Sequence, residues 1–337
     1  MMKRHLSTYL TMITILILSS ASDCKRDDGN QINYETGEFP EETVNLTEIN
    51  SIYDDYNVAL PQIAGDLPLT FSSNRNSQGS DFNIVSAYIY FVFSQVDAEF
   101  LVQGSMLEES FYQILEEKVN TERDELGPYR YFNGSNGLEY FFWSEEDATG
   151  KLDIKYLNYS PANPSTSLLN SIPAGVSALN SSSSDGYICF DKDLTMAYFI
   201  NDGSGNFDIV QAGIDDEVAF DSWLEGDPVT INRTDSINSE YNDKCPFIRD
   251  NIMLFTSDRP GGLGGYDLYY SVYRNGKWSS PNNMGPAINT EHNEYRPVIG
   301  SSPGYSNKFI IFSSDRPEGL GGYDLYFRGI DLNKLTE

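Results

Sequence analysis

"FTSDRPGGLGGYDLYY" at residues 255–270 is repeated almost letter for letter as "FSSDRPEGLGGYDLYF" at residues 312–327. Thirteen of the sixteen positions are identical, and the two copies begin 57 residues apart. An active site is needed only once in a chain, so a repeated string indicates repeated architecture first. Function is then to be sought where the repeat is broken.

Each copy carries the pattern of short β-strands separated by turn residues. "NIMLFTS" (251–257) and "KFIIFSS" (308–314) precede an Asp-Arg-Pro loop, and "YDLYYSVY" (266–273) follows it with apolar residues at every second position. Asn275 and Gly276 are typical of a two-residue hairpin, because both central positions need a positive φ. A strand with Trp278 leads on to the next copy. The unit therefore contains four short strands.

Three markers recur in the same order and give five copies. The first is the end of a strand, with spacings of 71, 57, 56 and 57 residues, at Phe71, Phe142, Phe199, Phe255 and Phe312. The second is an apolar residue, Asp or Asn, then Leu or Ile, with the polar member at Asn83, Asp153, Asp208, Asp267 and Asp324. The third is an apolar residue, Asn, then Ser or Thr, with the Asn at Asn50, Asn120, Asn180, Asn238 and Asn289.

Four short strands in a repeated unit of about 45–60 residues are typical of β-propeller blades. The last copy ends after its third strand, whereas "VNLTEINS" (44–51) matches the end of a fourth strand. The N-terminal strand is therefore expected to complete the last blade, which removes the exposed sheet edges. The sequence predicts an all-β fold, a five-bladed β-propeller over residues 44–337.

The chain of 337 residues has a formal net charge of −28. That charge repels phosphate backbones and excludes nucleic acid as a partner. It also opposes adhesion to anionic lipids, so any attachment to a membrane needs a covalent lipid anchor.

The first residues are typical of an export signal, which we place at residues 1–23. Cys24 follows it, and "ASDC" is similar to the lipidation motif of bacterial lipoproteins, although Asp23 stands where a small residue is usual. Lipidation of Cys24 is one interpretation, and cleavage after Ala21 with a free Cys24 thiol is the other. We expect an exported outer-membrane lipoprotein, periplasmic or surface-facing, whose residues 24–43 form a flexible acidic tether.

The two best copies, residues 257–269 and 314–326, resemble the WD40-like repeats of TolB-type propellers, in the version found in bacterial envelope lipoproteins. The resemblance covers about a third of the chain and weakens in the first three copies, where Asn74 and Asn83 replace aspartates. It implies a location in the cell envelope and a non-catalytic binding role, and it supplies no catalytic residue.

Several features suggest chemistry but fit structure better. "GGLGG" precedes a strand, whereas a phosphate-binding glycine loop precedes a helix. His292 is the only histidine after the signal, and no cysteine lies near it to complete a zinc site. Cys189 and Cys245 could form a disulfide in an exported protein, but their short apolar strands favour two buried thiols. One group of acids recurs at one architectural position and is expected to accept hydrogen bonds within its blade, namely Asp153, Asp208, Asp267 and Asp324.

Other acidic residues stand just before the predicted innermost strands and would surround one mouth of the central channel. They are Asp54, Asp55, Asp124, Glu125, Asp185, Asp243 and Glu294. One interpretation is a glycoside hydrolase that uses two of these carboxylates as acid and as base or nucleophile. The other is a solvated polar rim without a cofactor, or with Ca²⁺ bound to its oxygens. Carboxylate-free inner strands and five-fold sameness favour the rim.

The Asp-Arg-Pro-Gly loops are expected on the same face as these acidic links. We therefore predict a non-catalytic, monomeric propeller that docks an envelope protein or a glycan on this rim. The predicted contacts are Asp124, Glu125, Asp185, Asp243, Glu294, Arg259, Arg316 and Tyr295. The opposite face, with hairpins such as 274–277, is expected to need only solubility. Residues 97–118 lengthen the first copy and are expected to form either a short amphipathic helix or a long outer strand pair.

Overall fold

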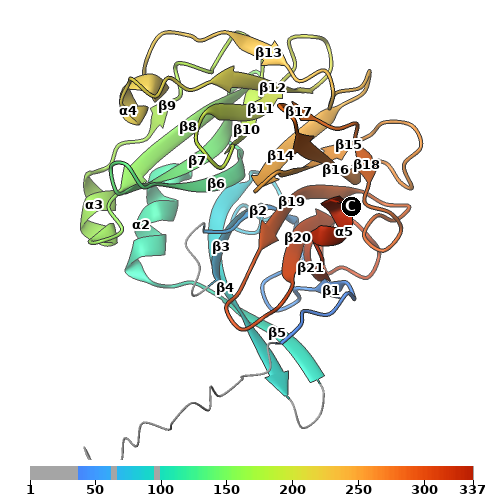
Figure 1. Cartoon of the computed structure of the whole chain (residues 1–337). Helices are drawn as coiled ribbons and strands as arrows, with labels where there is room; N and C mark the ends of the chain where they lie inside the picture. The colour runs from blue at the N-terminus through green and yellow to red at the C-terminus, as the bar shows by residue number, and fades with distance from the viewer. Residues whose placement is uncertain (1–36, 62–66, 95–98, 337) are drawn as a thin grey trace, which may run out of the picture. The chain divides into compact units, whose positions relative to one another are not determined.

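Each of the five copies forms one antiparallel sheet, and the five sheets surround a common axis (Figure 1). The computed structural model describes residues 37–61, 67–94 and 99–336. Within these residues the predicted all-β, five-bladed propeller is confirmed. The first strand of each blade is the innermost one, and these inner strands contact one another around the axis.

The blades follow one another along the chain. Blade 1 consists of β2 (Asp55–Ala59), β3 (Leu67–Ser73), β4 (Asn83–Ser94) and β5 (Glu99–Met106). Blade 2 consists of β6 (Glu125–Asn133), β7 (Leu138–Glu146), β8 (Leu152–Tyr159) and β9 (Ala174–Gly175). Blade 3 consists of β10 (Asp185–Phe190), β11 (Met196–Asn201), β12 (Asp208–Gly213) and β13 (Ile231–Arg233).

The last two blades differ in their outer strands. Blade 4 consists of β14 (Asp243–Arg249), β15 (Ile252–Ser257) and β16 (Asp267–Arg274), and two short outer strands, β17 (Lys277–Trp278) and β18 (Asn282–Asn283), both pair with β16. Blade 5 consists of β19 (Glu294–Gly300), β20 (Lys308–Ser314) and β21 (Asp324–Ile330), and the N-terminal β1 (Val44–Asn45) completes it.

The closing strand is the predicted one, and the packed chain begins before it. Val44 lies opposite Phe327 in the antiparallel pair of β1 and β21. Phe39 is 1% exposed, and its ring stacks on Tyr305 with 3.9 Å between the centroids. Gly329 in β21 lets the backbone of Phe39 come close, since a Cβ at Gly329 would lie 2.3 Å from the carbonyl oxygen of Phe39. The chain thus packs on blade 5 from Gly37, within the expected tether; residues 1–36, with Cys24, lie outside the described part.

The repeated asparagine explains one of the three sequence markers. In every blade its side-chain amide both accepts a hydrogen bond from, and donates one to, the backbone of a third-strand residue, at 2.7–3.0 Å. The pairs are Asn50 with Leu325, Asn120 with Ile84, Asn180 with Ile154, Asn238 with Ile209 and Asn289 with Leu268. These bonds fix the turn that enters the next blade, so the marker encodes the fold.

A β-bulge interrupts each inner strand near the axis. The register of the inner pair shifts in all five blades, and one residue there adopts a φ between 47° and 61°. The five residues are Asn57, Gly127, Tyr187, Cys245 and Arg296. A positive φ is unfavourable for bulky residues, so the innermost layer of the propeller is held in place by the blades around it.

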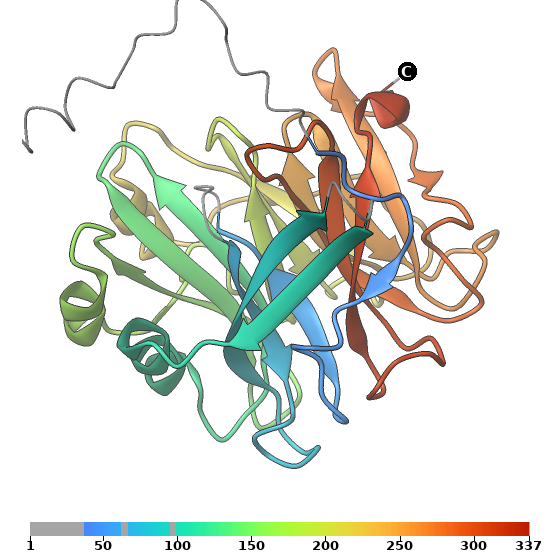
Figure 2. The ribbon, with the colours of Figure 1, turned by 90° about the horizontal axis from the view of Figure 1, so that it is seen from below.

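The insertion of the first copy contains both expected structures. Strands β4 and β5 form a long hairpin, which extends away from the axis, and α2 (Ser110–Val119) follows it (Figures 1 and 2). Tyr112, Leu115 and Val119 form the buried face of α2. The other helices in the described part of the chain are α3 (Pro164–Asn170), α4 (Phe220–Leu224) and α5 (Asn333–Thr336). No helix in the described residues has the length and apolar character that crossing a membrane requires.

Candidate active site

One end of the axis, here called the loop-side mouth, carries the Asp-Arg-Pro loops and the links between blades. The acids that begin the inner strands are all 0% exposed there: Asp55, Glu125, Asp185, Asp243 and Glu294. Each accepts a hydrogen bond from the backbone N–H of the Ser or Thr four residues earlier, at 2.5–3.0 Å. Five of the seven acids of the predicted ring therefore lie inside the blades without accessible surface, and Asp54 and Asp124 are partly exposed.

The arginines of the Asp-Arg-Pro loops are bound to these acids. Arg259 pairs with Asp243 and donates to the carbonyl of Ile237 at 2.7 Å. Arg316 pairs with Glu294 at 3.0 Å, and Arg75 pairs with Asp55 in the same way. Loops and acidic links therefore share one face, as the sequence predicted. The guanidinium of Arg259 also lies 5.0 Å from the ring centre of Tyr269, so its apolar surface is covered as well.

Asp124 and Tyr295, two other predicted contacts, also take part in packing. Asp124 accepts a hydrogen bond from the N–H of Phe82 at 2.7 Å, which joins blade 1 to blade 2. Tyr295 stands in a cluster of aromatic rings at this mouth, 5.4 Å from Tyr266 and 6.4 Å from Tyr323 between ring centroids.

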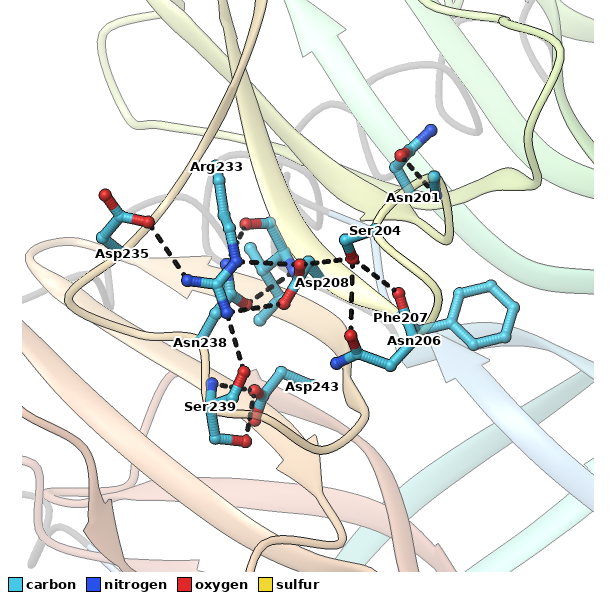
Figure 3. A network of polar contacts seen from close by, with 12 residues as sticks. Asn201, Ser204, Asn206, Phe207, Asp208, Arg233, Asp235, Asn238, Ser239 and Asp243 are labelled. Carbon is cyan, nitrogen blue, oxygen red and sulfur yellow. Dashed lines mark hydrogen bonds and ion pairs between the residues drawn. The ribbon is translucent and has the colours of Figure 1, made fainter.

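The repeated aspartates of the third strands also bind within their own blades. Asp267 accepts hydrogen bonds from the N–H groups of Leu263 and Gly264, and Asp324 does the same in blade 5. In blade 3, Asp208 is held instead by the hydroxyl of Ser204 and by Arg233 (Figure 3). The expected hydrogen bonds from loop amides are confirmed for Asp267 and Asp324, whereas Asp208 is bound within its blade by side chains.

Blade 2 is where the loop-side pattern breaks. Glu125 lies opposite Glu145 in the pair of β6 and β7, and Asp147 occupies the place of the loop arginine. Burial raises the pKa of Glu125 to about 7, against the lowering effect of hydrogen bonds from Thr121 and Asn83, and the Glu145 charge raises it slightly further. Glu145 itself lies 3.4 Å from Arg123. Two carboxylates here occupy different environments, but Glu125 is out of contact with solvent.

The axis holds a buried cation and two buried thiols. Arg296 is 0% exposed and donates to the carbonyls of Pro128 and Pro246 at 3.0 and 3.4 Å. Cys189 and Cys245 are both free and buried, as expected, and burial raises the pKa of each thiol to about 12. Such thiols are poor nucleophiles at neutral pH.

The other end of the axis, the hairpin-side mouth, is hollow. A cavity of about 290 Å³, here called the axial cavity, is lined by residues in the second half of the inner strands or just after them, and all five blades contribute. Its apolar wall is formed by Leu60, Tyr131, Phe190, Phe247 and Ile299. Two further hollows, of about 490 and 580 Å³, lie beside it and share the turn at residues 191–193. Trp278 and Tyr273 line the first of these.

The polar wall of the axial cavity contains carboxylates and basic groups. Asp191 accepts hydrogen bonds from the N–H and hydroxyl of Thr195, at 2.7 and 2.6 Å, and is thereby fixed. Asp250 is exposed at the turn between β14 and β15, with a φ of 55°. The basic groups are Arg130, Lys192 and Arg249. This arrangement offers two carboxylates beside aromatic walls.

Sequence reasoning missed these cavity residues. They stand at the ends of inner strands, outside the repeated markers, and "FDKD" (190–193) and "IRDN" (248–251) resemble ordinary hairpin turns. Among the described residues no group of three or more His, Cys, Asp and Glu side chains is placed to hold a metal ion.

Comparison with solved structures finds five-bladed glycoside hydrolases. A thermostable family-43 glycoside hydrolase matches with a TM-score of 0.51 at 15% identity, over 84% of this chain and 91% of its own. An exo-β-1,3-galactanase from Phanerochaete chrysosporium matches with a TM-score of 0.54 at 14% identity, over 87% and 64%. A GH43_1 enzyme from Xanthomonas citri gives 0.52 at 9% identity, over 85% and 90%. No protein-family model and no curated protein matches the sequence.

These findings correct three expectations from the sequence. The solved structures that share the fold are glycoside hydrolases and not TolB-type, WD40-like repeat lipoproteins, so the family resemblance was wrong. The non-catalytic docking function and the absence of enzymatic activity were wrong for the same reason. The physical cause is that the repeated letters encode hydrogen bonds inside a blade. They identify a propeller and carry no information about what the propeller acts on.

Proposed function

We propose that this chain is a carbohydrate-processing propeller that hydrolyses glycosidic bonds in the axial cavity. The observation that carries the proposal is the pair Asp191 and Asp250 in a cavity with aromatic walls at the axis. The likeness of the fold to five-bladed glycoside hydrolases supports it.

Two carboxylates at the axial cavity are the candidates for the acid and the base of the hydrolysis. Hydrolysis needs one carboxyl group that protonates the leaving oxygen and a second, ionised one that activates water or attacks the sugar. The bulge residues of the axis include no carboxylate. The acids that begin the inner strands at the loop-side mouth are 0% exposed and bound inside the blades. Asp191 and Asp250 remain, because both line the axial cavity.

Their different surroundings suggest different roles. Asp191 is fixed by Thr195 and by the N–H of Met196, at 3.0 Å, and so suits the carboxylate that receives a proton from the attacking water. Asp250 also lines the cavity and takes the remaining role, that of the group that donates a proton to the glycosidic oxygen. Water is added across one C–O bond, and the proton taken up at Asp191 restores the one lost at Asp250. Tyr131, Phe190 and Phe247 offer apolar faces against which a sugar ring can pack.

The test is a hydrolysis assay on a panel of oligosaccharides with arabinofuranosyl, xylosyl, β-1,3-galactosyl and galacturonosyl linkages, read by the release of reducing ends. Asp191→Asn and Asp250→Asn are each expected to lower the rate at least about 100-fold, as the loss of an acid–base group does. Asp227→Asn, at an exposed position away from the cavity, is the matched control. Absence of cleavage by the wild-type protein, or unchanged rates in both variants, would overturn the proposal.

We further propose that the protein is exported and anchored through a lipid on Cys24, as the N-terminal sequence suggests. Cys24→Ser in the native bacterium is expected to move the protein from the membrane pellet to the soluble fraction. A wild-type protein that is already soluble contradicts the anchor.

A further inference from the structure

We propose that the axial cavity takes an acidic saccharide, one whose sugar carries carboxylate or sulfate groups. This inference rests on the proposed function and names the substrate class. The balance of charged residues at the cavity differs from that of the rest of the molecule.

Basic side chains are concentrated in the axial cavity. Of the thirteen described residues that line it, three are basic and two are acidic. The whole chain has 22 basic and 50 acidic residues, so the balance at the cavity is the reverse of the average. A cavity without selection for an anion is expected to share the acidic character of the chain.

The three basic groups differ in how far they are already paired. Arg130 pairs with Glu139 at 2.6 Å and donates to the hydroxyl of Tyr159 at 3.2 Å, so its charge is neutralised although its Nη1 has no partner. Arg249 donates to the hydroxyl of Ser301 at 3.3 Å, and a guanidinium has five N–H groups. Lys192 is exposed, 3.9 Å from Asp193. Arg249 and Lys192 can therefore bind an anionic group at the mouth of the cavity.

Arg296 adds a third positive charge behind the cavity wall. It donates to the carbonyls of Pro128 and Pro246, and the residues that directly follow these prolines line the cavity. Its Nε has no hydrogen-bond partner. Within the described chain no carboxylate lies within 4.0 Å of its charged nitrogens. The ring of Tyr187, 5.6 Å away, compensates only part of the charge.

A buried cation without a counter-ion is costly, and an anion held in the cavity would lower that cost. A free inorganic anion could supply the charge, but it would leave the aromatic wall without a function. A saccharide with a carboxylate supplies the negative charge and also covers the aromatic wall. The forked guanidinium of Arg249 suits a planar carboxylate, and a sugar ring can pack on Phe190 and Phe247.

The experiment compares a trisaccharide of galacturonic acid with the trisaccharide of galactose, by calorimetric titration against the full chain. The acidic sugar is expected to bind at least about tenfold more tightly, the usual effect of a charged hydrogen bond, and more weakly as salt is raised. Arg249→Gln is expected to remove this preference, while Arg274→Gln, on an exposed hairpin tip, keeps it. Arg296→Met is a second variant that leaves the lining of the cavity unchanged.

Three results would overturn the inference, and they are distinguishable. Equal or tighter binding of the neutral sugar removes the acidic class but leaves the proposed function standing. Binding of neither sugar, together with no hydrolysis, removes both proposals. A titration with inorganic sulfate that stabilises the protein against heating as much as the acidic sugar does, and that Arg296→Met abolishes, assigns the charge to a free anion.

Discussion

The two mouths of the propeller use charge in opposite ways. At the loop-side mouth the acids that begin the inner strands are 0% exposed, and their oxygens accept hydrogen bonds from backbone amides, hydroxyls and loop arginines. At the hairpin-side mouth the charged residues line a cavity of about 290 Å³. The repeated acids of the sequence therefore stabilise the blades and do not form the candidate site. The candidate site lies where charged groups are accessible and incompletely paired.

The largest expected effect on stability comes from the seam of the ring, where the N-terminal strand β1 pairs with β21. Hydrogen bonds at the loop-side mouth cross this seam. Asn45 and Asn50 at the N-terminal end bind Asp324 and Leu325 near the C-terminal end. Deletion of residues 37–51 removes these bonds and the buried side chains of Phe39, Leu46 and Ile49, each worth about 1.5–3 kcal/mol. The total approaches the stability of a whole domain, so the protein is expected not to fold, as read by circular dichroism and denaturant titration.

A control at the same seam removes an exposed contact and leaves the buried ones in place. Lys334→Ala breaks an exposed ion pair with Glu41 at 2.8 Å, and because solvent screens such a pair, the variant is expected to unfold at the same denaturant concentration as the wild-type protein. A deletion variant that unfolds at the same denaturant concentration as the wild-type protein would show that β1 does not hold the ring closed.

One substitution made at both mouths tests the comparison directly. Asp243→Asn weakens a buried ion pair and leaves the Arg259 charge without its partner, which is expected to cost about 3 kcal/mol. Asp250→Asn changes an exposed turn whose positive φ asparagine also tolerates, so we expect a change within about 0.5 kcal/mol. Both are measured by urea unfolding. Equal losses in the two variants would mean that the mouths do not differ in this way.

The sequence predicted the blades because each marker is a local hydrogen-bond rule. The asparagine of the third marker bonds to the third strand, and the serine or threonine after it donates to the acid four residues later, as Ser239 does to Asp243. That spacing was visible in all five copies and could have indicated that the acids are buried pins. The interpretation as a solvated rim, which five-fold sameness and carboxylate-free inner strands favour, leaves this hydrogen bond out of account.

The axial cavity could not be predicted in the same way. Its wall joins residues from five strands that are far apart in the chain, such as Leu60, Phe190 and Ile299. The hollow depends on how these side chains fill the end of the axis, and no spacing within one copy encodes that. Arg296 likewise stands in "EYRPVI", a strand pattern that gives no sign of a buried, unpaired cation.

The smallest expected effect concerns blade 2, the exception at the loop-side mouth. The pKa of Glu125 rises from its ordinary value of 4.5 to about 7 in the folded protein, mainly because the group is buried. Between these two pH values the unfolded chain has lost the proton that the folded protein still holds. The contribution of Glu125 to stability is therefore present below pH 4.5 and is lost as the pH rises through 7.

Glu125→Gln removes this dependence, because glutamine resembles the protonated acid at every pH. We expect the variant to gain about 1–2 kcal/mol on the wild-type protein between pH 4.5 and pH 8, after an allowance for screening by solvent. The pKa values of Asp185 and Glu294 are also raised by burial, but the difference between variant and wild type cancels their effect. The same change in blade 5, Glu294→Gln, weakens the pairing of Arg316 and should destabilise at neutral pH. A constant difference between Glu125→Gln and the wild type, measured by urea unfolding at four pH values, would mean that blade 2 holds its acid as the other blades do.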